Sequence, residues 1–194
     1  MAQLYFHYAA MNAGKSAALL TAAHNYHERG MGALILKPAV DDRESASEVV
    51  SRIGLRKEAN IVTPDMDLYE FYKWAESQKD IHCVFVDEAQ FLTSDQVFEL
   101  CQIVDHYNIP VMCYGLRTDF RGLLFEGSKA LLSVADKLVE LKGVCHCGRK
   151  STMVARIRED GSAITDGDQV VIGGNDSYVS LCRKHWCELT GVYK

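Results

Sequence analysis

The sequence predicts an α/β protein in two parts: a parallel sheet with flanking helices over residues 1–142, and a small β-rich lobe over residues 143–194. The first two-thirds of the chain alternates short apolar runs with helical patterns, which is typical of a parallel sheet covered by helices. After Leu141, turn signals such as Gly173-Gly174-Asn175-Asp176 separate β-rich runs. Four of the seven cysteines also fall there, which places the domain boundary near residue 142.

Length and composition exclude several classes of protein. The 194 residues, 48% hydrophobic and 24% charged, are those of a globular chain and exclude a collagenous, low-complexity or wholly disordered one. The net charge of −5, without a long Lys/Arg run, argues against a nucleic acid or a membrane surface as the main partner. No apolar stretch approaches the roughly 18–20 residues that span a bilayer. Because a signal-peptide pattern is also missing, we expect a cytoplasmic protein.

Apolar runs and helical periodicity locate the elements of the sheet domain. Four or five parallel strands are predicted, at residues 4–8, 33–37, 61–63, 81–86 and 111–114. Helices are predicted from Ser16 to near Gly30, over residues 68–78, and from a cap at Thr93 to His106. The first ends where glycine can adopt a positive φ, and the other two begin with capping-box spacing, Asp67 with Glu70 and Thr93 with Gln96.

Residues 9–16, AAMNAGKS, lie between the first strand and the first helix, where a phosphate-binding P-loop would stand. Such a loop needs backbone N–H groups around phosphate oxygens, an ammonium group at the β- and γ-phosphates, and a small hydroxyl for Mg²⁺. Gly14, Lys15 and Ser16 supply these parts. Ala9 stands where the GxxxxGK[ST] pattern has glycine, so the loop must tolerate a methyl group. A chance Gly-Lys-Ser at a helix start is the alternative, and the strand and helix on either side argue against it.

Asp87 and Glu88 follow directly on the apolar strand at residues 81–86, where P-loop proteins carry a Walker-B acidic residue. An aspartate there can hold the Mg²⁺ shell, and a neighbouring glutamate can accept a proton from an attacking hydroxyl. Glu88 is therefore the candidate general base. Acidic residues often begin a loop without a catalytic role, but the P-loop upstream favours the catalytic interpretation.

Two close pairs of metal-binding residues fall in the C-terminal lobe. They are Cys145-x-Cys147 and Cys182-x-x-His185, with His146 and Cys187 as spare candidates. Four such ligands suit a closed tetrahedral Zn²⁺ site that ties two segments together, so we expect a structural zinc ion. Buried thiols or surface groups are the alternative. The other cysteines, Cys83, Cys101 and Cys113, lie in apolar segments and are predicted to be core residues.

Three further features keep two interpretations each. Phe120 and Phe125, in the loop at residues 115–127, can stack on a flat ring or fill a local core. Gly173-Gly174 forms either a plain turn or a lasso that closes over a small substrate. Asp41-Asp42-Arg43 is either a solvated charge cluster or a source of a carboxylate and a guanidinium near a transferred phosphate.

Together these motifs resemble the type II thymidine kinases, RecA-like P-loop proteins with a C-terminal zinc lobe, in their bacterial and phage form. The resemblance covers nearly the whole chain. It rests on AAMNAGKS, Asp-Asp-Arg at 41–43, VDEAQFL at 86–92, YGLRTDFRG at 114–122, CHCGRK at 145–150 and VVIGGNDSYVSLCRKH at 170–185. Alanine at position 9 and histidine as the fourth zinc ligand are variants that the bacterial branch accepts.

The resemblance implies a role for each matching residue. Glu88 is the catalytic base, and Cys145, Cys147, Cys182 and His185 bind zinc. The nucleotide site comprises Ala9, Ala10, Met11, Asn12, Ala13, Gly14, Lys15, Ser16, Asp87 and Gln90, with Asp41 and Arg43 near the transferred phosphate. The thymidine pocket comprises Met11, Phe91, Leu116, Phe120, Phe125 and Tyr178, and a lasso of Val171, Ile172, Gly173 and Gly174 grips the base through its backbone. Phe120 corresponds to the stacking phenylalanine of the family.

The function implied is a cytoplasmic kinase of pyrimidine salvage that uses ATP and Mg²⁺ to phosphorylate the 5′-hydroxyl of thymidine or deoxyuridine for DNA synthesis. The resemblance also implies inhibition by the end product dTTP and assembly into dimers or tetramers. The alternative is a zinc-containing P-loop ATPase that acts on DNA or a protein, but basic and acidic residues alternate in the lobe and leave no basic stripe. A scaffold with a vestigial P-loop is a third possibility, against which the intact Lys15, Ser16 and Asp87 argue.

Overall fold

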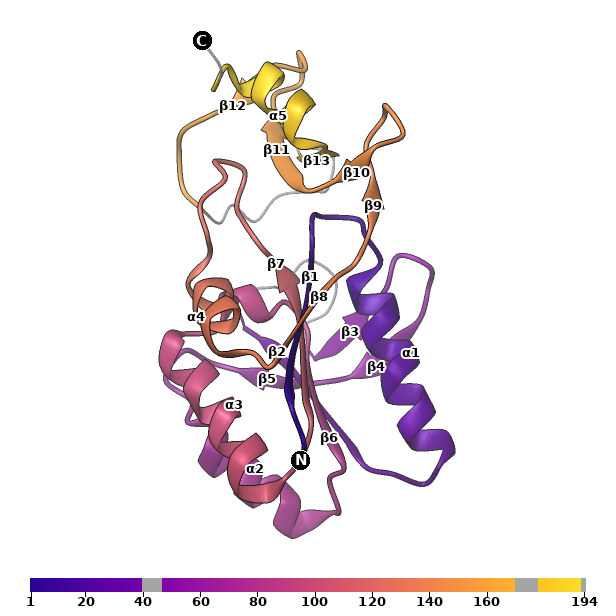
Figure 1. Ribbon diagram of the computed structural model, residues 1–194. Coiled ribbons are helices and arrows are strands. Elements are labelled where there is room, and N and C mark those ends of the chain that lie inside the picture. Colours follow the sequence, from indigo (N-terminus) through magenta and orange to yellow (C-terminus); the bar gives the residue numbers. More distant parts are fainter. Residues whose placement is uncertain (40–46, 170–177, 193–194) are drawn as a thin grey trace.

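The computed structural model describes residues 1–39, 47–169 and 178–192. Its centre is a sheet of six parallel strands in the order β5-β2-β6-β7-β1-β8 (Figure 1). The strands are β1 (Leu4–Ala9), β2 (Ala33–Pro38), β5 (Asn60–Val62), β6 (Cys83–Val86), β7 (Val111–Leu116) and β8 (Lys137–Glu140). Strand β7 lies between β1 and β6, so one strand separates the P-loop from the acidic pair. The predicted α/β class is confirmed.

Helices cover both faces of this sheet. Helix α1 (Lys15–Glu28) covers one face, together with a hairpin of β3 (Glu48–Val50) and β4 (Arg56–Glu58). Helices α2 (Leu68–Gln78), α3 (Ser94–Tyr107) and α4 (Glu126–Val134) cover the other (Figure 1). This arrangement requires strands that are apolar on both sides, because neither face of the sheet is left to solvent.

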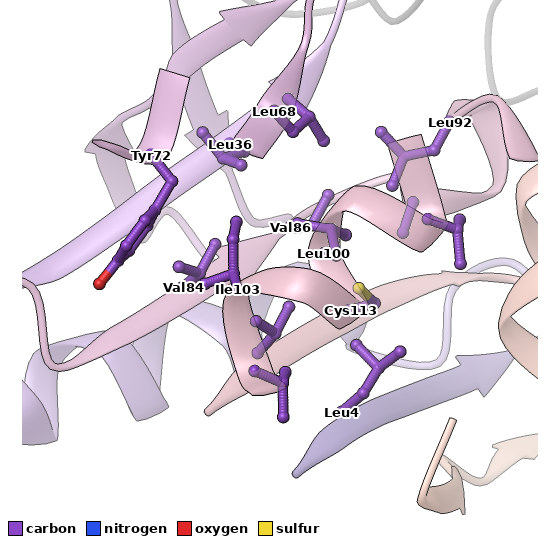
Figure 2. Packing of buried hydrophobic residues seen from close by; sticks show 14 of the residues in the cluster. Leu4, Leu36, Leu68, Tyr72, Val84, Val86, Leu92, Leu100, Ile103 and Cys113 are labelled. Atoms are coloured by element: carbon purple, nitrogen blue, oxygen red, sulfur yellow. The ribbon is translucent and has the colours of Figure 1, made fainter. Parts of the chain in front are cut away.

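Strand β6 shows how one sequence run serves two cores. Val84 and Val86 belong to the core under α2 and α3, whereas Cys83 and Phe85 belong to the core under α1. Successive side chains of a strand point to opposite faces, so all four residues are buried. Figure 2 shows the first core, in which Val84 and Val86 lie among side chains of the neighbouring strands and of α2 and α3.

The predicted helix ends are present. Thr93 and Gln96 form a capping box, in which each backbone N–H donates to the other residue's side chain over 3.2 Å. At α2, the Asp67 carboxylate accepts from the N–H of Glu70 over 2.8 Å. Gly30 follows α1 with a φ of 70°.

Sequence reasoning missed helix α4, strand β8 and the β3–β4 hairpin. Strand β8 is a partly exposed edge strand of sequence KLVE, so it lacks the continuous apolar run of the inner strands. Strand β4 reads RKE and is exposed at both ends. Helix α4 begins at Glu126, within the stretch that the sequence predicts as a loop. The helix is only nine residues long, so its apolar periodicity is short.

The C-terminal segment forms a small lobe beyond the carboxyl ends of the sheet strands (Figure 1). It contains β9 (Gly143–Val144), β10 (Lys150–Ser151), β11 (Met153–Ile157), β12 (Ala163–Ile164), β13 (Tyr178–Leu181) and α5 (Arg183–Thr190). Trp186 of α5 is central, since its indole N–H lies 3.1 Å from the carbonyl oxygen of Phe120 and 3.0 Å from that of Val154. Strand β8 ends at Glu140 and β9 begins at Gly143; the division into two domains between them stays a prediction.

Over the described part of the chain, no helix has both the length and the apolar character that crossing a membrane requires.

His7 is a titratable group held inside strand β1. Its imidazole stacks on the ring of Tyr114, with centroids 4.4 Å apart and an interplanar angle of 10°. Its Nε2 is buried and has no hydrogen-bond partner among the described residues. Burial lowers the pKa of His7 below its ordinary value of 6.5, because the charged imidazolium would lose its hydration there.

Acidification below pH 6.5 should therefore destabilise the protein through His7. The unfolded chain takes up a proton that the folded His7 resists, so this contribution to stability is complete above pH 6.5 and is lost as the pH falls through the lower folded pKa. We expect His7→Phe to show a smaller loss of stability between neutral and acidic pH, measured by urea unfolding at a series of pH values. His27→Phe, at an exposed histidine of α1, is the control. Equal pH dependence in both variants would contradict this assignment.

Candidate nucleotide and nucleoside site

Four strands end at one cavity. The carboxyl ends of β1, β2, β6 and β7 border a space of about 260 Å³. It is lined by residues 11–17 and 50–53 and by Lys37, Asp87, Glu88 and Leu116. Ligands of open α/β sheets bind at this edge, where loops and helix N-termini converge.

The P-loop turns from β1 into α1 at the mouth of this cavity. Two of its residues adopt the left-handed region, Asn12 with a φ of 61° and Gly14 with a φ of 78°. Ala9 is the last residue of β1 and pairs with Leu116, so its backbone is extended and tolerates a methyl group. The left-handed turns that the loop needs are thus supplied by asparagine and glycine and not at position 9. Lys15 begins α1, and its ammonium donates to the Ala10 carbonyl over 3.1 Å.

Ser16 and Asp87 join the P-loop to strand β6. The Ser16 hydroxyl donates to Asp87 Oδ2 over 3.0 Å. Asp87 is only 3% exposed, and its Oδ1 is buried without a hydrogen-bond partner among the described residues. Burial, together with the neighbouring carboxylate of Glu88, raises the pKa of Asp87 to about 7. A buried, partly unpaired carboxylate beside a hydroxyl fits a hydrated Mg²⁺, a cation that prefers oxygen ligands.

Glu88 lines the cavity from an unusual backbone position. Its φ of 49° lies in the left-handed region, and the short 3₁₀ turn η1 (Ala89–Phe91) follows it. This conformation costs a non-glycine residue on the order of 1 kcal/mol. One of its carboxylate oxygens accepts from the Gln90 side chain over 2.5 Å. The arrangement places a carboxylate beside Asp87, as the sequence predicts.

Lys37 is a site residue that sequence reasoning missed. It lies in β2, lines the same cavity, and is buried, with its ammonium donating to the Glu48 carbonyl over 3.0 Å. The available signal was a lysine near the end of the apolar run ALILKP, in a strand buried on both faces. Lys15 and Lys37 thus bring two positive charges to a cavity that also holds two carboxylates.

Five of the residues predicted to hold a nucleoside, from the P-loop and from the segments that follow β6 and β7, lie in three different surroundings. Met11 and Leu116 line the cavity itself. Phe91 and Phe125 contact each other edge to face, with ring centroids 5.7 Å apart. Phe120 is 2% exposed, and the guanidinium groups of Arg121 and Arg156 lie 5.6 and 5.7 Å from its ring centroid.

Phe120 is therefore buried against the lobe, and its stacking role stays a prediction. Tyr178, at the start of β13, is half-buried. The predicted residues Asp41, Arg43, Val171, Ile172, Gly173 and Gly174 lie outside the described residues.

The lobe holds the P-loop directly. The Ser180 hydroxyl of β13 donates to the Met11 carbonyl over 2.7 Å. The Arg117 guanidinium, just after β7, donates to the Thr152 carbonyl over 3.2 Å. These two hydrogen bonds attach the cysteine-rich lobe to the P-loop and to the end of β7.

The four predicted metal ligands meet in the lobe. The sulfur atoms of Cys145 and Cys182 lie 3.4 and 3.5 Å from Nδ1 of His185, and the sulfur atoms of Cys147 and Cys182 are 3.9 Å apart. All four ligand atoms lie within 4.8 Å of one another. With a Zn–S bond of ~2.3 Å, tetrahedral geometry separates two sulfur ligands by ~3.8 Å. The cluster could therefore hold a zinc ion.

The two spare candidates lie outside this cluster. Cys187 is buried in the apolar core of the lobe, beside Trp186. His146 stacks on His185, with ring centroids 4.3 Å apart, and so packs against a ligand.

A parallel sheet whose P-loop faces a carboxylate pair, buried at Asp87 and half-buried at Glu88, defines a P-loop protein built for phosphoryl transfer. Comparison with known proteins gives the particular family. The family model "Thymidine kinase" matches residues 2–186. Over 190 residues the chain is 70% identical to the thymidine kinase of enterobacteria phage T4, covering 98% of each chain. It is 56% identical over 191 residues to that of Aliivibrio fischeri and 57% identical to that of Vibrio cholerae, covering 98% of this chain and 100% of each relative. The chain belongs to the thymidine kinase family, as its motifs predict.

Proposed function

We propose that the chain transfers the γ-phosphoryl group of ATP to the 5′-hydroxyl of thymidine or deoxyuridine, giving ADP and the nucleoside monophosphate. The observation that carries the chemistry is the Ser16–Asp87 hydrogen bond beside Glu88, at a cavity bordered by the P-loop. Membership of the thymidine kinase family supports the nucleoside.

The positive groups of the cavity would stabilise the phosphates. The N-terminus of α1 and the Lys15 ammonium face the space that the β- and γ-phosphates would occupy, and both favour the charge that develops during transfer. Ser16 and Asp87 would hold Mg²⁺, which would neutralise negative charge on the phosphates when bound. We assign Asp41 and Arg43 to the same phosphates on the family resemblance alone.

Glu88 would act as the general base. Its carboxylate would take the proton of the nucleoside hydroxyl as the new O–P bond forms. The bond between the γ-phosphorus and its bridging oxygen breaks in the same step, and the electron pair leaves on the β-phosphate of ADP. The nucleoside would lie toward Leu116 and the aromatic residues Phe91 and Phe125, which follow β6 and β7 at the same edge.

Nucleoside-dependent turnover tests this proposal. We expect Mg·ATP to release ADP with thymidine and deoxyuridine, and not with single-stranded DNA in place of a nucleoside. ADP release stimulated by DNA alone would instead support the alternative, a P-loop ATPase whose lobe binds nucleic acid. Other deoxynucleosides in the same assay define the base preference.

Glu88→Gln tests the base. The amide keeps the size of the side chain but cannot accept the proton, so kcat should fall by about 10²-fold or more while ATP binding changes little. Steady-state kinetics and ATP titration measure the two effects. Glu70→Gln, on the exposed surface of α2, is the control. Near-normal turnover in Glu88→Gln would show that another group takes the proton.

We further propose that the zinc ion is structural. The cluster uses all four positions of a tetrahedral ion for protein ligands, which leaves none for substrate. Cys145 and Cys147 lie in the turn between β9 and β10, whereas Cys182 and His185 lie at the start of α5, so the ion would fasten two segments of the lobe.

We expect each chain to contain one zinc ion. Removing the ion with a chelator should partly unfold the lobe. Trp186 is 6% exposed in the lobe core and Trp74 is 58% exposed on α2, so Trp186 emission in a Trp74→Phe background reports on the lobe. Chelation should shift this emission to longer wavelength. Cys147→Ser should lose zinc, measured by atomic absorption, whereas Cys187→Ala should retain it. Full zinc content in Cys147→Ser would contradict the ligand assignment.

Two regulatory properties extend the proposal. The triphosphate dTTP carries both the base that the nucleoside pocket would accept and the phosphates that the P-loop would accept, so it is the proposed feedback inhibitor. The family resemblance further supports assembly into a homodimer or homotetramer and a place in the cytoplasm.

A further inference from the structure

Gln90 is almost completely buried and uses both ends of its amide. Its side-chain N–H donates to Glu88 Oε2 over 2.5 Å, and its Oε1 accepts from the backbone N–H of Leu116 over 2.9 Å. It is 1% exposed and, unlike Asp87 and Glu88, is absent from the lining of the cavity in the described residues. Gln90 therefore contacts Glu88 from outside the described lining of the cavity.

The packing around this amide leaves it little freedom. A Cβ atom added at Gly115 would lie 2.8 Å from Gln90 Oε1 and 3.0 Å from the Gln90 backbone nitrogen. On the other side, a Cβ atom at Gly127 would lie 2.4 Å from the Ala89 carbonyl oxygen. The 2.8 and 2.4 Å distances are shorter than real carbon contacts allow and the 3.0 Å distance is very tight, so the η1 turn packs between β7 and α4 in this way because both positions are glycine.

We propose that Gln90 is a positioning residue that fixes the carboxylate of Glu88 and ties it to Leu116, a residue of the nucleoside side of the cavity. A free glutamate side chain can rotate about its torsions, whereas a base must stay within about 0.5 Å of its productive position. Gln90 supplies a fixed donor for that purpose, anchored in turn on the end of β7. This inference rests on the proposed role of Glu88 as the base.

The geometry also separates this role from a nucleotide contact. The Gln90 amide already meets Glu88 and Leu116, and its burial keeps it out of the cavity. Loss of Gln90 should therefore lower the rate of phosphoryl transfer and leave substrate binding nearly unchanged. A displacement of about 1 Å at a reacting group can cost on the order of 10²-fold in rate.

Gln90→Met removes both hydrogen bonds at similar size. We expect kcat to fall about 10-fold or more, with KM for ATP and for thymidine changed little. Gln96→Met is the matched control, because Gln96 is an equally buried amide with both ends bonded, at the start of α3 and away from the cavity. It should lose thermal stability and keep kcat. A second variant, Gln90→Glu, keeps an acceptor for Leu116 but places a carboxylate against Glu88, and it should lose kcat as strongly.

A double-mutant cycle decides whether Gln90 acts through Glu88. In a Glu88→Ala background, measured by single-turnover kinetics, adding Gln90→Met should cost no further rate, because the group that it positions is gone. Losses that multiply, or a raised KM for ATP with normal kcat, would overturn the proposal in favour of a separate structural or nucleotide role. Near-normal turnover of Glu88→Ala alone would instead show that the base assignment is wrong, which is a distinct outcome.

Discussion

The parallel direction of the sheet strands is the constraint on which the site depends. Because β1, β2, β6 and β7 all run the same way, their carboxyl ends meet at one edge and deliver the P-loop, Lys37, the acidic pair and Leu116 to one cavity. The register between neighbouring strands sets how far along the sheet each site residue lies. Ala9 pairs with Leu116, and the Asp87 N–H donates to the Leu36 carbonyl over 3.0 Å. Two apolar cores hold these strands in place from both faces.

The same edge concentrates features that a stable core would avoid. Asp87 and Lys15 are buried charges, Asp87 Oδ1 lacks a partner among the described groups, and Glu88 has a left-handed backbone. Burying a carboxyl group without a full set of partners, as at Asp87, lowers stability, and such groups persist where a ligand site uses them. The well-packed strands behind the cavity supply the stability that this edge lacks.

The sequence was most informative where local chemistry and element order coincide. A Gly-Lys-Ser after an apolar strand, an Asp-Glu after another, and paired cysteines each have a physical reason for their spacing, so the P-loop, the acidic pair and the metal cluster could be predicted. Lys37 could not, and Gln90 was placed in the nucleotide site by resemblance without its contacts to Glu88 and Leu116, because these roles depend on what the fold places beside each residue. Strand β8 and the β3–β4 hairpin were missed because β8, an edge strand, and β4, a surface strand, are largely polar. Their sequences therefore lack the apolar pattern by which strands are predicted.

The η1 turn leaves no room for a side chain at Gly115 or at Gly127. Neither needs glycine for its backbone angles, since neither has a positive φ; each is glycine because a single methyl group would collide with the η1 turn. Alleles that replace either codon should therefore displace the Gln90 amide or the η1 backbone and lower enzyme activity, although the altered residue carries no functional group. In a genetic screen such alleles would be indistinguishable from active-site lesions, and side-chain chemistry alone would misclassify both positions as replaceable loop residues.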